Sequence, residues 1–410
     1  MAERLSTTQK KGFGISLLNW FKSRENQLIL SLCLLTLIFH LCIVTHYPSP
    51  TFDENYYVPE ARSIVYTHTI IHPEHPSLGK LFIASGIGVF GDNPWGWRVP
   101  SILFGVACVI LFYLLCRMML GALAALFASI LLTFESLTFN LSGLAMLDVF
   151  SLGFMLGGLL LYWRNRPILS GGFIALSALC KMTGLMGAVI IVAHYITRRK
   201  QPEWRGAALF VLSLCISFVL LMPLFDFAAA RELNPFARMI DILAGSGGVT
   251  WGSYTPQELA NANATYPWAW LLSPSGYPVI TPTYGGVISP SVWILIVPSI
   301  AYMVYEFYES KRNGNRRSVA LFVLIWFIVT YLLWIPIVIL TDRVTYIYYF
   351  YPTVGAICVA IAIAMARLWD ISSGWRRRLA RAIVIVFLAI HILFFLGFTP
   401  LVESLGSLSR

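Results

Sequence analysis

Long apolar runs separated by short basic segments constrain this chain more than any other feature of its sequence. A helix needs roughly 20 apolar residues to cross the hydrocarbon core of a bilayer. One long apolar stretch, 168–197, is interrupted by Lys181 and Gly184, so we expect two short helices there, about 168–181 and 184–197, that form a hairpin. The sequence predicts an all-α polytopic membrane protein with about eleven transmembrane helices: the hairpin pair and nine runs near 27–45, 98–116, 119–138, 144–163, 206–225, 290–308, 319–340, 345–366 and 382–399.

The composition agrees with a membrane protein and excludes other classes. The chain is 58% hydrophobic and 12% charged, whereas a soluble domain is roughly half apolar and about a quarter charged. The net charge of +10 does not indicate a nucleic-acid partner, because the basic residues form short clusters between the apolar runs. The seven cysteines lie in or beside apolar runs without disulfide or metal spacing. We expect a single transmembrane domain over 1–410, with no separate soluble domain.

The distribution of basic residues predicts the orientation. With the N-terminus in the cytoplasm and the C-terminus outside, 21 lysines and arginines fall in inner segments and 7 in outer ones, as the positive-inside rule requires. Two large outer loops follow, 46–97 and 227–289. The acidic residues show the opposite bias, which places any chemistry on the extracytoplasmic face.

The acidic pair Asp53–Glu54 stands at the start of the first outer loop. Adjacent carboxylates repel each other and are costly near hydrocarbon. One of them could act as a general base on an acceptor hydroxyl. The alternative is a solvated acid that caps the next helix, and position alone does not separate the two.

The segment His72–Lys80 combines histidines, an acid, prolines and a lysine. Two histidines three residues apart leave a divalent metal possible, but Pro73 and Pro76 oppose a regular helix that would align them. We favour a rigid loop that presents His75 and Lys80 to an anionic group.

Isolated charges near the outer ends of spans are further candidates. Arg98 could extend to the interface or pair with an acid or a phosphate. Asp148, at the entrance of a span, is expected to face a polar cavity. Lys181 lies where two half-helices meet, with Asp148 or Asp342 as its expected partner.

Arg343 precedes a tyrosine-rich segment that includes Tyr348. The tyrosines could form a plain aromatic belt. An arginine beside several phenol groups would also suit a lipid phosphate at headgroup level.

In this order, the motifs resemble the protein O-mannosyltransferase family (glycosyltransferase family 39), which has a GT-C membrane fold with eleven spans and a cytoplasmic N-terminus. The resemblance covers most of the first 200 residues and thins toward the C-terminus. The matching pieces are Phe-Asp-Glu at 52–54, His-Pro-Ser-Leu-Gly-Lys at 75–80, Phe-Gly at 90–91, Gly-Trp-Arg at 96–98, Met-Leu-Asp at 146–148, Lys-Met-Thr-Gly at 181–184, and Arg343 followed by Tyr348 through Pro352.

The resemblance implies transfer of mannose, or a related hexose, from a polyprenyl or dolichyl phosphate to a hydroxyl group, with inversion at the anomeric carbon. It implies no firm cofactor. The membrane would be the plasma membrane in a prokaryote or the endoplasmic reticulum in a eukaryote. The implied roles are general base for Asp53, orientation of acceptor or sugar for Glu54, ion pairing to the acidic loop for Arg98, phosphate binding for Lys80, Lys181 and Arg343, and substrate binding for His75, Asp148 and Tyr348.

Three departures from the family pattern leave the acceptor open. Ser77 stands where the usual His-Pro-Pro has its second proline, and Tyr348–Tyr349–Phe350 replaces the usual Tyr-His-Tyr. The second outer loop is too short for the β-trefoil (MIR) domain of eukaryotic members, which favours a prokaryotic-type enzyme. Ser or Thr of a protein is the first expectation. A lipid or glycan acceptor, as in the related aminoarabinose transferases, is the alternative.

A secondary transporter is the main rival from another class. It predicts paired, interrupted helices in two halves and polar residues at mid-membrane. Here one interrupted segment stands out, and the polar candidates lie in the first outer loop and at outer helix ends.

Overall fold

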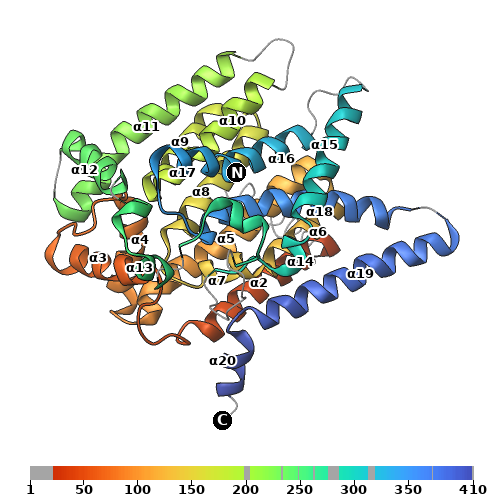
Figure 1. The fold of residues 1–410 in the computed structure, drawn as a ribbon, viewed down its shortest axis with the longest axis horizontal. Coiled ribbons are helices and arrows are strands. Elements are labelled where there is room, and N and C mark those ends of the chain that lie inside the picture. The colour runs from red at the N-terminus through yellow and green to blue at the C-terminus, as the bar shows by residue number, and fades with distance from the viewer. Residues whose placement is uncertain are drawn as a thin grey trace, which may run out of the picture.

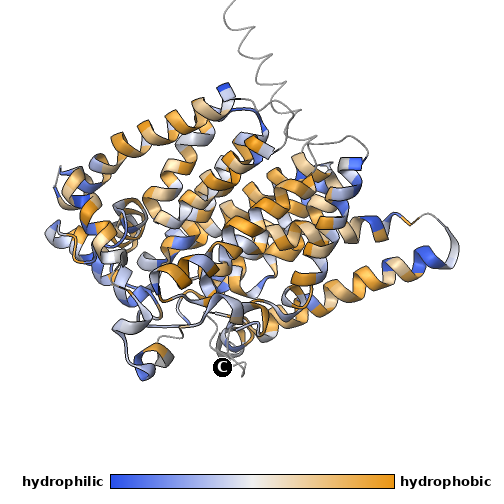
Figure 2. Cartoon of the chain, turned by 45° about the horizontal axis from the view of Figure 1, so that its top comes forward, coloured by the Kyte–Doolittle hydropathy of each residue, from blue (hydrophilic) through white to orange (hydrophobic). Residues whose placement is uncertain are grey.

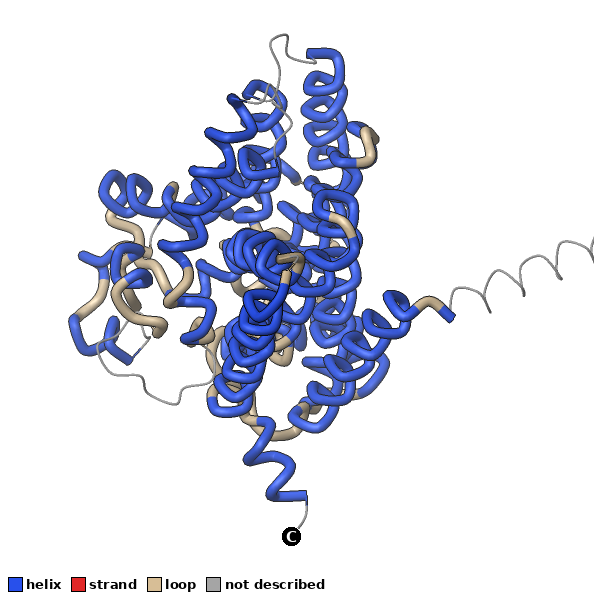
Figure 3. The backbone as a smooth tube through the Cα atoms, turned by 90° about the vertical axis from the view of Figure 1, so that its right-hand side faces the viewer, coloured by secondary structure: helices blue, strands red, loops and turns tan. Residues whose placement is uncertain are grey.

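The computed structural model describes residues 22–197, 204–231, 234–247, 249–261, 264–275, 286–312, 319–371 and 373–408 (Figure 1). Regular structure in these ranges is helical, and extended pairing is limited to two isolated bridges, Thr250 with Arg343 and Ala264 with Tyr346 (Figure 3). The predicted all-α class is therefore confirmed.

Among the described residues, six helical segments are long and apolar enough to cross a membrane. Hydrophobic residues dominate these helices, and hydrophilic ones gather at helix ends and in connecting segments (Figure 2). The chain is thus an integral, multi-pass membrane protein. Four of the six are single helices: α2 (Arg24–Ile43), α5 (Pro94–Leu120), α11 (Trp204–Ala230) and α19 (Gly374–Gly397). The fifth, Val319–Thr341, consists of α16 (Val319–Phe327), the π-helix η4 (Ile328–Leu332) and α17 (Trp334–Thr341). The sixth, Ile347–Trp369, consists of the 3₁₀-helix η5 (Ile347–Phe350) and α18 (Tyr351–Trp369).

Shorter helices complete the bundle. Several of them pack against α5 and α11 rather than forming long independent rods. They are α6 (Ala122–Thr133), α7 (Ser136–Ser142), α8 (Leu147–Trp163), α9 (Pro167–Cys180), α10 (Met186–Thr197), α14 (Pro290–Trp293), α15 (Ile296–Arg312) and α20 (Leu401–Leu408).

The predicted interruption at Lys181 is confirmed. Helix α9 ends at Cys180, Lys181 is extended, and a 3₁₀ turn over Met182–Leu185 leads into α10. A second interruption was not predicted. Instead of one span over 119–138, α6 and α7 meet at 62°, because the buried Glu135 caps α7 by accepting a hydrogen bond from the Thr138 amide at 2.6 Å.

The two predicted outer loops contain helices of their own. The first contributes α3 (Glu54–Thr67) and α4 (Ser77–Phe90), and the second contributes α12 (Pro235–Gly247) and α13 (Pro256–Asn261). Figure 1 shows these four helices gathered on the left of the view, away from α15 and α19. The candidate site lies where α3 and α4 meet the N-terminal end of α8 and the η5 turn.

Candidate functional site

Asp53 directly precedes α3, but it does not act as a helix cap. Its side chain makes no capping hydrogen bond. Instead, the Tyr348 hydroxyl donates to Asp53 Oδ2 at 3.0 Å, and Tyr57, one helical turn along, also hydrogen-bonds this carboxylate. The preceding Phe52 has a φ of +56°, and its ring meets Tyr348 edge-on at 5.1 Å. The capping alternative from the sequence therefore does not describe this residue.

The surroundings of Asp53 make it a poised proton acceptor. Burial raises the pKa of Asp53 to about 6, and the neighbouring Asp148 raises it further, whereas Lys181 and the two tyrosine hydroxyls oppose the rise. A general base is most effective when its pKa lies near the working pH. Asp53 meets this condition.

Lys181 and Asp148 form a buried ion pair beside Asp53. The ammonium group lies 2.9 and 2.8 Å from the two carboxylate oxygens and 5.1 Å from the centre of the Tyr348 ring. The helix break at Lys181 brings this side chain to the start of α8, where Asp148 lies. The other expected partner, Asp342, is exposed and accepts the Gly252 amide at 3.0 Å.

Glu54 is fully buried and bound to the protein through both oxygens. Arg98 Nε lies 2.8 Å from Oε1 and Nη2 lies 2.6 Å from Oε2. The amides of Ala145 and Thr51 supply one further donor to each oxygen, at 2.7 and 3.1 Å. Arg98 also donates to the carbonyl oxygens of the chain leaving α2. Glu54 thus joins three segments around Asp53 rather than presenting a free carboxylate.

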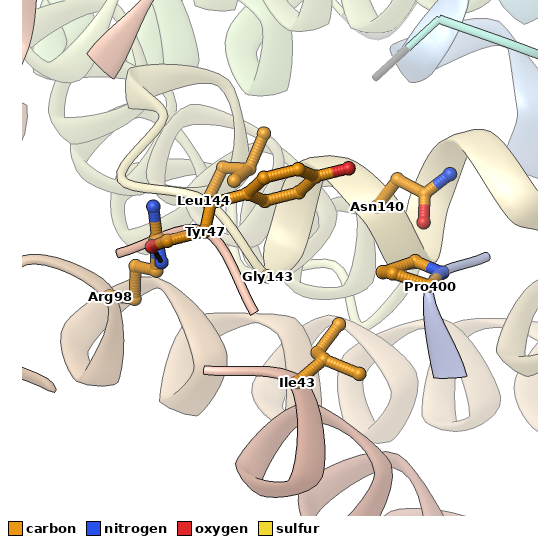
Figure 4. Close-up of a pocket in the computed structure, with 7 residues that line it drawn as sticks. All are labelled: Ile43, Tyr47, Arg98, Asn140, Gly143, Leu144 and Pro400. Atoms are coloured by element: carbon orange, nitrogen blue, oxygen red, sulfur yellow. Dashed lines mark hydrogen bonds between the residues drawn. The ribbon is translucent and has the colours of Figure 1, made fainter. Parts of the chain in front are cut away.

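A small cavity adjoins Arg98 and Tyr47 (Figure 4). Its volume is about 20 Å³, enough for about one water molecule and far too small for a sugar. Figure 4 shows Tyr47, Leu144 and Arg98 on one side of it and Asn140 and Pro400 on the other. The cavity therefore lies among the residues that hold the Glu54 segment in place and is not a substrate site.

Lys80, expected on the phosphate side, lies fully buried against Glu60 at 2.8 Å. It also donates to the His72 carbonyl oxygen. The second Glu60 oxygen accepts the amides of Ile71 and His72, each at 2.8 Å. This second buried ion pair holds the His72 segment against α3, so Lys80 does not present a free charge to a phosphate.

His75 is half-buried beside Tyr57, with 6.0 Å between the ring centres. Burial lowers the pKa of His75 well below its usual value, and the charges of Lys181, Lys80, Arg343 and Arg238 add to this effect. The imidazole is therefore neutral near pH 7, with one donor and one acceptor nitrogen.

Arg343 lies half-buried in the same region and is hydrogen-bonded to Tyr349. Its backbone pairs with Thr250 of the segment 227–289. Arg343 and Lys181 are the two expected phosphate ligands that the structure places among the site tyrosines.

Three residues of this region were missed in the sequence. Tyr57 carries a weak signal, because four residues separate it from Asp53, the spacing of neighbours on a helix. Arg238 lies in α12 and Asp226 in α11, and no motif or spacing in the sequence identifies either residue. Both are buried.

The metal site that His72 and His75 left possible is not supported by a cluster of ligands in this region. His72 instead lies 3.7 Å from Glu74 in an ion-pair geometry. Across the described ranges, no three His, Cys, Asp or Glu side chains are grouped so that they could hold a metal ion.

Comparison with known sequences supports the resemblance. The sequence model of a family described as dolichyl-phosphate-mannose-protein mannosyltransferase matches residues 74–225. A polyprenol-phosphate-mannose–protein mannosyltransferase of Mycobacterium tuberculosis is 32% identical over 130 residues, which are 30% of this chain and only 25% of that protein. The enzymes of the same description from Corynebacterium glutamicum and Mycolicibacterium smegmatis are 23% and 25% identical and align over 86% and 92% of this chain and 84% and 89% of their own lengths.

Solved structures show the fold. The protein O-mannosyltransferase Pmt1–Pmt2 complex of S. cerevisiae, bound to the sugar donor, has a chain that aligns with a TM-score of 0.67, 12% identity and coverage of 93% of this chain and 90% of that chain. ArnT from Cupriavidus metallidurans, bound to undecaprenyl phosphate, aligns with a TM-score of 0.63, 16% identity and coverage of 92% and 76%. The chain therefore shares the GT-C architecture of these proteins, and its resemblance to the protein mannosyltransferases is confirmed.

Proposed function

We propose that this protein is an inverting glycosyltransferase that moves mannose, or a related hexose, from a polyprenyl or dolichyl phosphate to a hydroxyl group of Ser or Thr in a protein. The observation that carries the proposal is the placement of Asp53, whose carboxylate has a pKa of about 6 and lies beside the Asp148–Lys181 pair. The names of the bacterial relatives support the same donor and acceptor.

In this mechanism Asp53 removes the proton from the acceptor hydroxyl as the acceptor oxygen attacks the anomeric carbon. The new bond forms on the face opposite the phosphate, which inverts the configuration. The bond between the anomeric carbon and the phosphate oxygen breaks, and its electron pair leaves with the polyprenyl phosphate monoester. Arg343 stabilises the negative charge that grows on this leaving group, and Lys181, although paired with Asp148, adds its positive charge to the same region.

The other residues of the region position these groups. Glu54 and Arg98 fix the chain on either side of Asp53, and Lys80 fixes the His72 segment through Glu60. We therefore assign Glu54 and Lys80 to positioning, which differs from the substrate contacts that the family resemblance implies. His75, Asp148 and Tyr348 remain as candidates for substrate contacts.

The topology proposed for this function has eleven spans, a cytoplasmic N-terminus and an extracytoplasmic C-terminus. The loops 46–97 and 227–289 then lie outside and carry Asp53, His75 and Arg238. A separate catalytic loop at 46–97 is supported by the gathering of α3, α4, α12 and α13 at one end of the molecule (Figure 1). The Mycobacterium and Corynebacterium relatives favour the plasma membrane of a prokaryote.

The decisive experiment is mannose transfer by the purified full chain in liposomes. Polyprenyl phosphomannose is the donor and a Ser/Thr-rich peptide is the acceptor. Replacing a general base costs about 10²- to 10⁴-fold in rate, so Asp53→Asn is expected to lose that much. Asp92→Asn is the matched control, since Asp92 binds Arg62 at 2.8 Å and the Trp97 indole at 2.7 Å and makes no hydrogen bond to Asp53, Glu54 or Arg98. Full activity of Asp53→Asn would refute the proposed base.

The acceptor is tested in the same assay. A peptide, a polyprenyl-linked glycan and a lipid A-type acceptor are compared with the wild-type protein. Transfer to the peptide alone supports the protein mannosyltransferase assignment. Transfer to the lipid or the glycan alone would favour the alternative acceptor class, while the role of Asp53 would be unchanged.

A further inference from the structure

We infer that Arg238, Asp226 and Ser77 form a clamp through which the second outer loop positions His75 for the transfer reaction. The inference rests on the proposed function and adds positioning residues outside the Asp53 cluster, of which Arg238 and Asp226 also lie outside the family motifs. We call these three residues the Arg238 clamp.

Arg238 holds the backbone on both sides of one residue. Its guanidinium donates to the carbonyl oxygens of Pro73 and His75, each at 2.7 Å. The side chain is 4% exposed, so water does not compete effectively for these bonds. Two parallel donors in a planar group fix orientation as well as distance. The chain around Glu74 is thereby held in one arrangement.

Asp226 connects Arg238 to α4. Its Oδ1 lies 3.6 Å from Arg238 Nε and accepts a hydrogen bond from the Ser77 hydroxyl at 2.5 Å. Asp226 lies in α11 and Ser77 begins α4. One carboxylate therefore links a membrane-spanning helix, the second outer loop and the helix that follows His75.

Ser77 gives this clamp a signature in the sequence. A proline is usual at this position in the family that the chain resembles, and a proline has no hydroxyl to offer Asp226. The departure from the His-Pro-Pro pattern and the buried acid 149 residues away are thus parts of one contact. This accounts for a difference that the site around Asp53 leaves unexplained.

Helix α12 also approaches the same segment directly. A Cβ atom added at Gly245 would lie 3.1 Å from the Cβ of Glu74 and 3.2 Å from its Cα. This spacing is tighter than an ordinary van der Waals contact. The second outer loop therefore touches the Pro73–His75 segment at two independent points, through Arg238 and through Gly245.

The consequence falls on His75. Its imidazole contacts Tyr57, which in turn hydrogen-bonds Asp53. A displacement of about 1 Å in a substrate-positioning group can cost about 100-fold in rate. The clamp makes no contact with Asp53, so its loss is expected to impair substrate positioning and to leave the ionisation of the base unchanged.

The first test is a double-mutant cycle with Arg238→Ala and His75→Ala, measured as kcat and KM for polyprenyl phosphomannose. Each single variant is expected to raise KM about tenfold and to lower kcat/KM by about 10- to 100-fold. The double variant is expected to be no worse than His75→Ala, because the clamp acts through His75. The acidic limb of the pH profile should stay near pH 6. Arg238→Lys should restore part of the loss.

Two further variants guard against simple misfolding. Ser77→Pro places proline at the first position of α4, where helices accept it, after Pro76 with an extended ψ of 161°; it should fold and show a KM defect like that of Arg238→Ala. Gly245→Ala should raise KM, whereas the matched Gly88→Ala, with nothing within 4 Å, should not.

The outcomes separate this inference from the proposed function. If Asp53→Asn abolishes transfer while Arg238→Ala and Ser77→Pro behave like wild type, the clamp is refuted and the function stands. Fully additive losses in the Arg238/His75 cycle would also refute it, as would a shifted acidic limb. If the wild-type protein transfers no sugar from any polyprenyl phosphosugar, the proposed function fails first.

Discussion

Tyr348 donates a hydrogen bond to Oδ2 of Asp53 at 3.0 Å across 295 residues of sequence. The bond joins the start of α3 to the η5 turn that opens α18. The phenol favours the ionised carboxylate, in opposition to burial. The proton affinity of the candidate base is therefore set partly from the other end of the chain.

The replacement Tyr348→Phe should raise the pKa of Asp53 above its value of about 6, because the carboxylate loses a donor that stabilises its charge. The acidic limb of kcat/KM should move to higher pH, and activity at pH 6 should fall several-fold more than activity at pH 8. A pH–rate profile in liposomes measures the shift.

Tyr351→Phe is the control for this change. Tyr351 is equally buried, and in the described part of the chain its hydroxyl has no hydrogen-bond partner. An acidic limb that stays in place in Tyr348→Phe would contradict the assignment of this limb to Asp53.

The Asp148–Lys181 pair should tune Asp53 in opposite directions. Lys181 lowers the pKa of Asp53 and Asp148 raises it. Lys181→Met is therefore expected to move the acidic limb to higher pH, and Asp148→Asn to lower pH. Lys181→Met should also weaken donor binding, because it removes a cation proposed to face the phosphate. Shifts of the same sign in both variants would contradict this electrostatic account.

The carboxylate of Asp53 should lower the stability of the folded protein at neutral pH. Burial raises the pKa of Asp53 from an ordinary 3.8 to about 6, so between these values the folded protein binds a proton that the unfolded chain has released. Stability then falls as the pH rises through this interval. Asp53→Asn should be more stable than wild type at pH 8, by up to about 3 kcal/mol, with a smaller advantage near pH 4. Thermal unfolding at the two pH values measures the difference, and a constant offset would contradict it.

Much of the architecture could be predicted because single-residue patterns determine it. The hydrophobic runs identified the helices, and Lys181 with Gly184 identified the break between α9 and α10. The bend after α6 was missed because it depends on Glu135 reaching the amide of Ser289 at 2.8 Å as well as its own helix. Such a contact, 154 residues apart, leaves no local signal.

The residues of the candidate site likewise fall into those that local sequence patterns predicted and those whose roles depend on contacts between distant segments. Asp53, Asp148 and Lys181 were found because charges beside apolar runs are conspicuous. The roles of Glu54 and Lys80 could not be read in this way, since a buried carboxylate or ammonium paired within the protein has the same sequence signature as one that awaits a ligand. Arg238 lies in α12, where no sequence pattern identifies it, and only its hydrogen bonds to the backbone of Pro73 and His75 do so.

Arg98 should contribute far more to stability than Arg62. Removing one partner of a buried ion pair costs about 3 to 5 kcal/mol, and Arg98 is 1% exposed against Glu54. Arg62 pairs with Asp92 at the surface with 37% exposure, where such pairs contribute about 0 to 1 kcal/mol. Arg98→Met should lower the melting temperature strongly and Arg62→Met only slightly. Equal effects would contradict the role of Arg98 as the anchor of the Asp53 segment.

The crossing of α4 and α5 provides a test of packing beneath the site. A Cβ atom added at Gly86 would lie 2.1 Å from the carbonyl oxygen of Gly96, which is backbone and cannot move aside. Gly86→Ala should therefore separate the helices, lower the melting temperature and reduce transfer by displacing Arg98, two residues beyond Gly96. Gly88→Ala, two residues further along the same helix with nothing within 4 Å of the added atom, should be neutral or stabilising by about 0.5 to 1 kcal/mol. The two variants share a helix and a chemical change. A lower melting temperature in Gly86→Ala but not in Gly88→Ala would therefore isolate the effect of the backbone contact. Equal stability of the two variants would show that α4 and α5 do not cross as closely as described.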